Sequence, residues 1–400
     1  GMPEFDSLYL KYEKDKSIPK QTIGAQELFQ ALLKERAETG RIYIMNLDHC
    51  NTHSSFKDKV YMSNLCQEIT LPTTPVQHID DKEGEIALCI LSAINLGLLT
   101  DMNELEELCD LSVRALDEII DYQEYPVEAA KISAQSRRSL GIGYIGLAHY
   151  LAKNQVKYED KKAWKLVDKI TEAFQFYLLK ASNNLAKEKT KCLWFEKTKY
   201  SDGILPIDTY KKELDEIVKR DYTYDWEWLR KEIKEHGLRH STLSAQMPSE
   251  SSSVVSNATN GVEPPRDYLS VKKSKKGPLK QIVPDYNRLK NYYTLLWDMK
   301  GNEGYINIIA VMQKYFDQAI SGNWSYNPEN YKDGEVPLSV MAQDLLTTYK
   351  LGWKTAYYQN TYDAKSDVDE PVHPVGWHDG VEETPKETKE DEEDCEACTI

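Results

Sequence analysis

The spacing of apolar residues along the chain predicts helices separated by short extended segments. Residues 25–38 place apolar side chains three or four positions apart, which is the period of an amphipathic helix. The stretch 160–190 predicts a long helix, and the stretch 84–121 is also expected to be helical. Two short runs, 41–46 and 305–311, favour strands. We find no internal repeat.

The segment 63–72 alternates in a way that predicts extended backbone. Alternate residues of an extended segment face the same way, so Asn64, Cys66 and Glu68 would project together from one edge. A thiol can act as a nucleophile or a one-electron carrier, a neighbouring carboxylate can take a proton, and an amide can hold a hydroxyl. The alternative is an edge strand that turns ordinary polar residues towards solvent.

Residues 248–266 combine a Ser-rich start with a Pro-Pro stop. Ser249 to Ser252 can cap a short helix, and Gly261 can end it. The free backbone N–H groups, the hydroxyls and the positive end of the helix dipole would form an anion site. An ordinary Ser-capped helix is the alternative.

Three glycines, Gly141, Gly143 and Gly146, match the pattern G-x-G-x-x-G. A dinucleotide fingerprint follows a buried strand, whereas the residues before this pattern, 136–140, do not read as one. We therefore expect close helix packing at these glycines and no dinucleotide site.

Tyr357 and Tyr358 are neighbouring phenols near the C-terminus. Two such phenols can stack and exchange an electron and a proton. The alternative is a pair of half-buried strand residues, because tyrosine is common in strands.

The last residues carry two further thiols, Cys395 and Cys398. They follow an acidic stretch without periodicity, which predicts a disordered tail. Two thiols on such a tail can form and exchange a disulfide. A zinc site that includes His373 and His378 is an alternative with looser spacing, and a tail without function is another.

Composition narrows the class of protein. The chain has 400 residues and a net charge of -15, which suggests two or three domains or one large α/β unit and argues against a general nucleic-acid binder. We see neither an apolar run long enough to span a bilayer nor a signal peptide. The seven cysteines do not form a secreted disulfide framework, so we expect a cytoplasmic protein. Tyr outnumbers Phe 26 to 7, which leaves many redox-capable phenols.

Together these motifs resemble the large (alpha) subunit of class I ribonucleotide reductase over essentially the whole chain. The resemblance implies an α/β fold, in which residues 1–362 form the C-terminal part of a ten-stranded α/β barrel. Cys66 would lie at the tip of a finger loop threaded through that barrel, and residues 363–400 would form the flexible acidic tail. The shared segments are 39–44, 48–53, 63–66, 84–89, 95–97, 137–143, 203–208, 248–266, the tyrosine pair and the tail cysteines.

The resemblance also implies roles in reducing a ribonucleotide to a deoxyribonucleotide. Cys66 matches the cysteine that becomes a thiyl radical and takes the ribose 3′ hydrogen. Glu68 matches the base that removes the 3′-hydroxyl proton, and Asn64 matches the amide that holds the sugar hydroxyl. Cys89 matches one of two thiols that become a disulfide when the 2′-hydroxyl leaves as water.

The remaining matches concern binding, radical transfer and re-reduction. Tyr357 and Tyr358 match the tyrosines that carry the radical to the thiol, with Arg41 near them. Cys395 and Cys398 match the tail pair that re-reduces the active-site disulfide, although their C-x-x-C spacing is tighter than in the best-known members and would change its redox potential. The site for the substrate's diphosphate is matched by Ser249, Glu250, Ser251 and Ser252.

The resemblance implies that this chain holds no metal or cofactor of its own. The tyrosyl radical and di-iron centre belong to a small (beta) subunit, and the ATP and dNTP effectors bind an N-terminal part of the large subunit. The second active-site thiol lies upstream of residue 1 in relatives. We therefore expect either an excerpt or the product of a split gene.

The expected partners follow from the same resemblance. They are an N-terminal large-subunit polypeptide, the radical-bearing small subunit, thioredoxin or glutaredoxin, and a ribonucleoside diphosphate, with neither nucleic acid nor membrane. An isolated half-barrel would leave strand edges open, so a stable partner is expected. The alternative function is a non-catalytic scaffold that only binds the small subunit.

Overall fold

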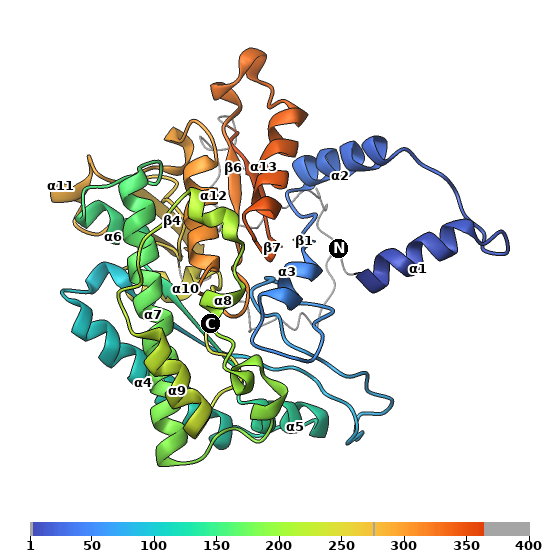
Figure 1. Ribbon diagram of the computed structural model, residues 1–400. Coiled ribbons are helices and arrows are strands. Elements are labelled where there is room, and N and C mark those ends of the chain that lie inside the picture. Colours follow the sequence, from blue (N-terminus) through green and yellow to red (C-terminus); the bar gives the residue numbers. More distant parts are fainter. Residues whose placement is uncertain (1–2, 275–276, 364–400) are drawn as a thin grey trace.

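The computed structural model describes residues 3–274 and 277–363, and helices make up most of its regular secondary structure (Figure 1). Short 3₁₀ turns connect several of the regular elements. The helices are α1 (Pro3–Lys14), α2 (Ala25–Thr39), α3 (Leu47–Thr52), α4 (Met102–Tyr122), α5 (Glu128–Arg137), α6 (Leu147–Lys153), α7 (Lys161–Glu188), α8 (Pro206–Thr209), α9 (Trp226–His236), α10 (Glu250–Val255), α11 (Tyr286–Leu289), α12 (Glu303–Gln313) and α13 (Leu338–Lys350). The strands are β1 (Ile44–Met45), β2 (Ile90–Asn95), β3 (Leu140–Ile145), β4 (Leu269–Ser274), β5 (Gly277–Ile282), β6 (Trp324–Tyr326), β7 (Thr355–Ala356) and β8 (Gln359–Thr361).

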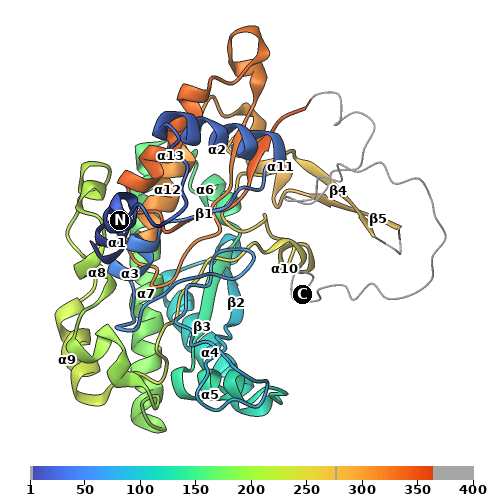
Figure 2. The ribbon, with the colours of Figure 1, turned by 90° about the vertical axis from the view of Figure 1, so that its right-hand side faces the viewer.

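Four of the eight described strands, joined by short bridges, belong to a wall of short parallel segments. β2 pairs with β3 in parallel, and single parallel bridges join Ile142 to Ser244 and Gln246 to Ile320. β6 and β8 are also parallel, whereas β1 is antiparallel to β7. β4 and β5 form a separate hairpin that projects from the body of the molecule (Figure 2).

The wall is open at one edge. Among the described residues, β2 pairs with β3 and with no other strand, so the predicted ten-stranded barrel is not closed. The physical reason is that a barrel closes only when its two edge strands pair with each other. The described residues therefore form an arc of an α/β barrel.

Helices cover one face of this arc. α4 and α7 pack against each other, and α4 also packs on β2. α4 begins where the Asp101 carboxylate accepts hydrogen bonds from the first free N–H groups of the helix, those of Asn103 and Glu104. Nearly every residue of α12 is buried, so this helix lies inside the core.

The structure confirms the helices predicted at 25–38 and 160–190 and corrects two other assignments. Residues 90–95 were expected to be helical but form β2. Periodicity alone does not distinguish a short buried strand from a buried helix, and here the pairing with β3 stabilises the strand. Residues 305–311 were expected to be a strand but lie in α12, which is buried on all sides and so lacks the polar stripe of a surface helix.

The three glycines of the G-x-G-x-x-G pattern were expected to mark helix packing, and that expectation is wrong. Gly141 and Gly143 lie within the buried strand β3, and Gly146 follows it with a φ of 76°. A Cβ at Gly143 would lie 2.7 Å from the carbonyl oxygen of Ala245, so the neighbouring segment approaches too closely for a side chain. The glycines thus serve strand packing.

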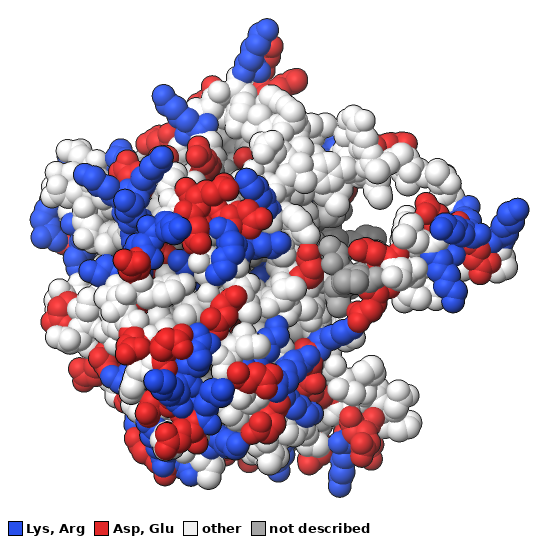
Figure 3. All heavy atoms as spheres, in the orientation of Figure 1, with Lys and Arg blue, Asp and Glu red and all other residues white. Residues whose placement is uncertain are grey.

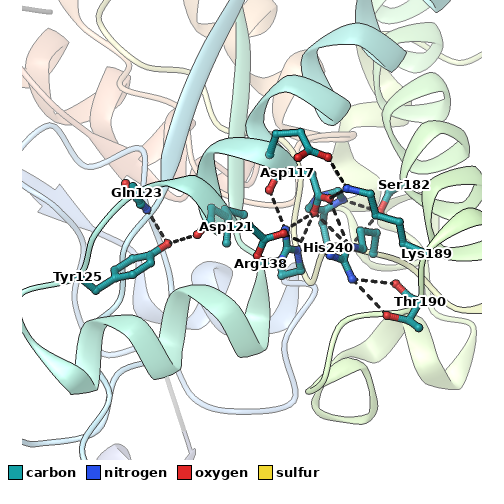
Figure 4. A network of polar contacts seen from close by, with 12 residues as sticks. Asp117, Asp121, Gln123, Tyr125, Arg138, Ser182, Lys189, Thr190 and His240 are labelled. Carbon is teal, nitrogen blue, oxygen red and sulfur yellow. Dashed lines mark hydrogen bonds and ion pairs between the residues drawn. The ribbon is translucent and has the colours of Figure 1, made fainter.

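A buried carboxylate, Asp117 of α4, joins several elements (Figure 4). Its oxygens accept hydrogen bonds from Arg138 Nε at 2.6 Å, Arg239 Nε at 3.0 Å and Lys189 Nζ at 3.0 Å. His240 Nε2 lies 3.2 Å away, and burial lowers the pKa of His240 to about 4, so this imidazole is neutral at pH 7. Burial would raise the pKa of Asp117, but these partners lower it well below its usual range.

Ser182 extends this network into an arrangement that resembles a catalytic triad. Its Oγ lies 2.9 Å from His240 Nδ1, on the opposite side of the imidazole from Asp117. All three side chains are fully buried, so a substrate could not reach them. We therefore assign the arrangement a structural role.

Charged side chains of both signs are mixed on one face of the molecule (Figure 3). On the face seen in Figure 3, Lys and Arg are interspersed with Asp and Glu, and that face has no broad basic area. Nucleic-acid binding depends on such an area, so this face offers no general nucleic-acid site.

Asp117→Ala should lower the free energy of unfolding by about 3–5 kcal/mol, because it leaves buried cations without a counter-charge. Asp121→Ala is the matched control: Asp121 also binds Arg138, but its side chain is 47% exposed, so a loss below about 1 kcal/mol is expected. Urea unfolding measures both values. Folding lowers the pKa of Asp117, so the stability that its charge contributes is present above the unfolded pKa and is lost as the pH falls through the folded pKa. The difference in unfolding free energy between wild type and Asp117→Ala should therefore shrink in acid. Equal losses for the two variants would contradict this assignment.

Candidate active site

The segment 63–70 forms a tight loop, which corrects the prediction of a strand. The N–H of Asn64 donates to the carbonyl of Ile69, and the N–H of Ile69 donates to Asn64 Oδ1 at 3.1 Å. Gln67 has a φ of 66°, which reverses the chain beside Cys66. The side-chain hydrogen bond of Asn64 favours this turn over extended backbone, and Cys66 therefore lies at the tip of the loop.

The loop is held on the segment 318–321. The N–H of Ala319 donates to the carbonyl of Glu68 at 3.0 Å, and Ser321 Oγ donates to Glu68 Oε2 at 3.1 Å. The Glu68 side chain is only 2% exposed, and this burial raises its pKa, although hydrogen bonds from Asn64 and Ser321 oppose the rise. The result is a carboxylate with increased basicity beside a thiol.

The two predicted tyrosines meet at this thiol. Tyr357 Oη donates to Cys66 Sγ at 3.4 Å, and the rings of Tyr357 and Tyr358 lie 4.2 Å apart between centroids at 61°. Burial and the contacts with Cys66 and Tyr358 raise the pKa of Tyr357, so its phenol stays protonated. The structure therefore brings Tyr358, Tyr357 and Cys66 together in a continuous row.

Cys89 lies next to the same loop, immediately before β2. Gln318 connects the two, because its Oε1 accepts from the N–H of Thr70 at 3.2 Å and its Nε2 lies 3.7 Å from Cys89 Sγ. A Cβ at Gly141 would lie 2.8 Å from the same sulfur, so this position needs glycine. Burial raises the pKa of Cys89, which keeps the thiol protonated.

Sequence reasoning missed three side chains of this site. Gln318 and Ser321 hold the loop but lie about 250 residues away, and nothing in their local pattern indicates contact with it. Tyr43 packs against both predicted tyrosines, with ring centroids 4.6 Å from Tyr357 and 5.2 Å from Tyr358. Burial raises the pKa of Tyr43 and the charge of Arg41 opposes this rise, so Arg41 is near the tyrosine group as expected.

The predicted anion site corresponds to α10, which is shorter than expected. Ser249 is its N-cap and is buried, and the helix ends at Val255, before the predicted stop at Gly261. Glu250 and Ser251 are partly exposed and Ser252 is exposed. The structure thus gathers the four predicted residues at the start of one short helix.

A pocket of about 150 Å³ adjoins α10. Glu263 lines it, and burial raises the pKa of this carboxyl to about 7, although its hydrogen bond with Asn323 and the charge of Arg266 oppose the rise. Asn323 Nδ2 donates to Glu263 at 2.5 Å, and its Oδ1 accepts from the N–H of Tyr358 at 2.9 Å. A single amide therefore connects the pocket to the tyrosine pair.

Some predictions lie outside the described residues. Cys395 and Cys398, together with His373 and His378, belong to this group. Within residues 3–274 and 277–363, no group of three His, Cys, Asp or Glu side chains could hold a metal ion. Over the same ranges, none of the helices has the length and apolar character needed to cross a membrane.

Comparisons with known proteins show the family to which this chain belongs. A family model described as "Ribonucleotide reductase, barrel domain" matches residues 1–359. The chain is 58% identical over 372 residues to the ribonucleoside-diphosphate reductase subunit alpha of Haemophilus influenzae, covering 92% of this chain and 49% of that protein. It is 56% identical over 382 residues to ribonucleoside-diphosphate reductase 1 subunit alpha of Escherichia coli K12, covering 95% and 50%. The subunit alpha of Enterobacteria phage T4 is 42% identical over 403 residues, covering 99% and 51%. The chain thus spans about half the length of the curated relatives it matches.

Glu68→Gln should increase the free energy of unfolding at pH 7 by on the order of 1 kcal/mol, because it removes a buried charge while the amide oxygen can still accept from Ser321. Burial raises the pKa of Glu68, so the fold loses stability as the pH rises through that pKa, and the variant should lack this loss. Denaturant unfolding between pH 4 and 8 tests both expectations. Glu85→Gln is the control and should lower the free energy of unfolding, because the buried Glu85 carboxylate pairs with the Arg137 guanidinium. A destabilised Glu68→Gln variant would contradict the argument.

Proposed function

We propose that this chain, which belongs to the ribonucleotide reductase family, is the catalytic C-terminal portion of a ribonucleoside-diphosphate reductase large subunit. The observation that carries the proposal is the 3.4 Å contact between Tyr357 Oη and Cys66 Sγ, with the Tyr358 ring packed edge-on against that of Tyr357. A hydrogen atom can pass between groups in such contact. A scaffold that only binds another subunit has no need for this arrangement.

The first half of the reaction creates and uses a radical. An oxidising equivalent passes from Tyr358 to Tyr357, and Tyr357 then takes the hydrogen atom of the Cys66 thiol. The resulting thiyl radical takes the 3′ hydrogen of the substrate ribose, which restores the Cys66 S–H bond and leaves a radical at C3′. Glu68 accepts the proton of the 3′-hydroxyl, a task that suits a carboxylate whose pKa is raised.

The second half removes the 2′-hydroxyl. This group leaves as water after it takes a proton from one thiol, and C2′ receives a hydrogen from the other. The two electrons come from Cys89 and a second thiol, which join as a disulfide, and Glu68 returns its proton to the 3′ oxygen. Cys66 then returns a hydrogen atom to C3′ and becomes a thiyl radical again. The balance is one ribonucleotide and one dithiol giving one deoxyribonucleotide, one disulfide and one water.

The substrate is a ribonucleoside diphosphate. Asn64 holds a sugar hydroxyl through its amide, which also fixes the loop. Backbone N–H groups at the start of α10 and nearby hydroxyls bind the diphosphate. The residues proposed for this diphosphate site are Ser249, Glu250, Ser251 and Ser252.

The open edge of β2 argues for a partner beside Cys89. Leu91 is 41% exposed on β2, and Ile86 and Leu88 are also exposed before it. A strand pairing there would cover these side chains and bring a second thiol to Cys89. We propose that an N-terminal large-subunit polypeptide supplies this strand and binds the ATP and dNTP effectors.

Two further partners complete the cycle. A radical-bearing small subunit with a tyrosyl radical and a di-iron centre provides the oxidising equivalent to Tyr358. The tail thiols Cys395 and Cys398 reduce the disulfide and are themselves reduced by thioredoxin or glutaredoxin.

Tyr357→Phe should reduce turnover below detection while substrate binding persists, because the ring remains but the phenol next to Cys66 is lost. The assay follows deoxynucleotide formation by the complete assembly with the N-terminal polypeptide and the small subunit, and substrate binding is measured separately. Cys66→Ser should be equally inactive, since the serine O–H bond is too strong to serve as the hydrogen-atom carrier. Tyr122→Phe on α4 is the control for an exposed phenol, at 91% exposure, and should retain normal turnover. Near-normal turnover of Tyr357→Phe would mean that the radical takes another route.

The double variant Cys395→Ser and Cys398→Ser should make about one product per site with thioredoxin or glutaredoxin and then stop. A small permeant dithiol should partly restore cycling because it reaches the disulfide without the tail. The control is the pair His373→Ala and His378→Ala, which should cycle normally unless the thiols bind zinc. Sustained turnover of the double serine variant on the protein reductant would exclude the tail from the cycle.

A further inference from the structure

A fully buried arginine, Arg36 of α2, lies beside the tyrosine group formed by Tyr43, Tyr357 and Tyr358. Neither the comparisons nor the proposed reaction gives this arginine a role. Arginine is almost never fully buried unless a counter-charge pairs with it, because removing the guanidinium from water is costly. The position of Arg36 next to three phenols therefore calls for a physical explanation.

The guanidinium donates to backbone carbonyls on two separate segments of the chain. Its Nη1 donates to the carbonyl of Tyr357 at 2.9 Å and also to the carbonyl of Ile42. Ile42 directly precedes Tyr43, whose ring packs against those of Tyr357 and Tyr358. A single nitrogen of Arg36 thus holds the backbone next to both parts of the tyrosine group.

The backbone of the tyrosine pair depends on side chains for two of its four hydrogen bonds. The N–H of Tyr357 and the carbonyl of Tyr358 bond to the backbone of the segment 322–324. The carbonyl of Tyr357 accepts from Arg36, and the N–H of Tyr358 donates to Asn323 Oδ1 at 2.9 Å. Loss of the Arg36 donor would leave a buried carbonyl unpaired directly between the two tyrosines.

The charge of Arg36 is not balanced by a carboxylate. Within residues 3–274 and 277–363 it forms no ion pair, and its Nε and Nη2 have no hydrogen-bond partner there. The guanidinium carbon lies 4.9 Å from the ring centroid of Trp324, so a cation–π contact is its main electrostatic support. A position that needed only a hydrogen-bond donor could have used a neutral side chain at lower cost.

Arg36 keeps its positive charge at neutral pH. Burial lowers its pKa to about 10, and the phenols of Tyr326 and Tyr43 oppose this decrease. Tyr326 Oη donates to the Asp344 carboxyl at 2.9 Å, and burial raises the pKa of that carboxyl. Arg41 is a second cation that acts on Tyr43. The tyrosine group therefore has a fixed positive charge next to its backbone.

A fixed cation distinguishes between the ways in which a phenol can be oxidised. Transfer of a hydrogen atom from Tyr357 to an oxidised Tyr358 moves one electron and one proton together, so both rings stay neutral. Loss of the electron alone would create a cationic ring near Arg36, which Coulomb repulsion opposes in a buried site. Loss of the proton alone is opposed by the burial that raises the pKa of Tyr357.

We propose that Arg36 is a positioning residue for radical transfer, which holds the Tyr43 and Tyr357 segments together and whose charge keeps electron and proton transfer coupled. The proposal rests on the proposed function. Arg36 does not touch the thiol or the substrate, and it acts through the carbonyl of Tyr357 and through its electrostatic field.

The sequence allows the Tyr357 carbonyl to be observed selectively. Tyrosine follows tyrosine only at 292–293 and 357–358, so labelling with carbonyl-¹³C and ¹⁵N tyrosine yields two peptide groups in which both atoms are labelled. Arg36→Met keeps the length of the side chain but removes its donor and its charge. The NMR signal of the Tyr357 carbonyl should therefore shift, while that of Tyr292 should not. This measurement uses the full chain and needs no turnover.

Turnover is measured in the complete assembly with the N-terminal polypeptide and the small subunit. Arg36→Met should lower kcat about tenfold or more and leave KM for the ribonucleoside diphosphate unchanged, because small displacements of reacting groups slow a transfer without weakening substrate binding. Lys34→Gln is the matched control on the same helix, with a side chain that is 70% exposed, and should be normal in both measurements. Circular dichroism and thermal melting verify that each variant is folded.

Arg36→Lys tests the charge separately from the hydrogen bond. A buried lysine loses its proton at a lower pH than arginine, as at Lys354, where burial lowers the pKa to about 7. The ratio of variant to wild-type kcat should therefore fall as the pH rises through the pKa of the new amine, which can still donate when neutral but carries no charge. Arg36 itself stays protonated over this range.

Three results would each overturn the proposal. They are an unshifted Tyr357 carbonyl signal in Arg36→Met, a normal kcat of that variant, and a kcat ratio for Arg36→Lys that does not change with pH. If Arg36→Met does not fold, the pH profile of Arg36→Lys decides. If the wild-type assembly makes no deoxynucleotide, the proposed function fails, and the carbonyl signal still decides whether Arg36 positions Tyr357.

Discussion

The position of the Cys66 loop depends on its hydrogen bonds to the segment 318–321. A loop with a left-handed residue at its tip is not stable by itself, and here Gln318, Ala319 and Ser321 supply its partners. That segment is fixed in turn by Lys354, whose buried ammonium donates to the carbonyls that precede it. Burial lowers the pKa of Lys354 to about 7, because this position disfavours the charged form of the amine. Because Lys354 lies three residues before Tyr357, the same interaction aligns the tyrosine strand with the thiol loop.

Burial also sets the kind of chemistry that the site can perform. It raises the pKa of Cys89 and of Tyr357, so this thiol and this phenol hold their protons at neutral pH. A thiolate nucleophile needs the opposite environment, with nearby positive charge or a helix N-terminus. Protonated S–H and O–H groups in contact favour transfer of hydrogen atoms. Glu68, by contrast, is a carboxyl whose raised pKa favours proton acceptance, and it is held beside the Cys66 loop by Ser321.

The sequence predicted different parts of the structure for different physical reasons. Helices α2 and α7 were predictable because their polar and apolar faces differ. α12 was not, since it is buried on all sides and lacks that contrast, and β2 was not, since a short apolar run does not distinguish a strand from a helix. The site residues came mainly from the family resemblance, and the predicted backbone of the Cys66 loop was wrong because turn hydrogen bonds of Asn64 outweigh alternation. Gln318 and Ser321 could not be found, because their partners are distant in sequence and their contacts are purely tertiary.

The place of Cys89 at an open edge restricts how a disulfide could form there. The Cα atoms of a disulfide lie about 4.4–6.8 Å apart, and neighbouring antiparallel strands place facing Cα atoms about 4.5–5.5 Å apart. A strand added beside β2 would therefore bring a thiol within bonding distance without distorting the backbone. Cys66 cannot take this part in the proposed reaction, because it must hold the radical until the hydrogen atom returns to C3′. One strand added at the open edge of β2 would therefore cover its exposed apolar side chains and would also supply a second thiol to Cys89.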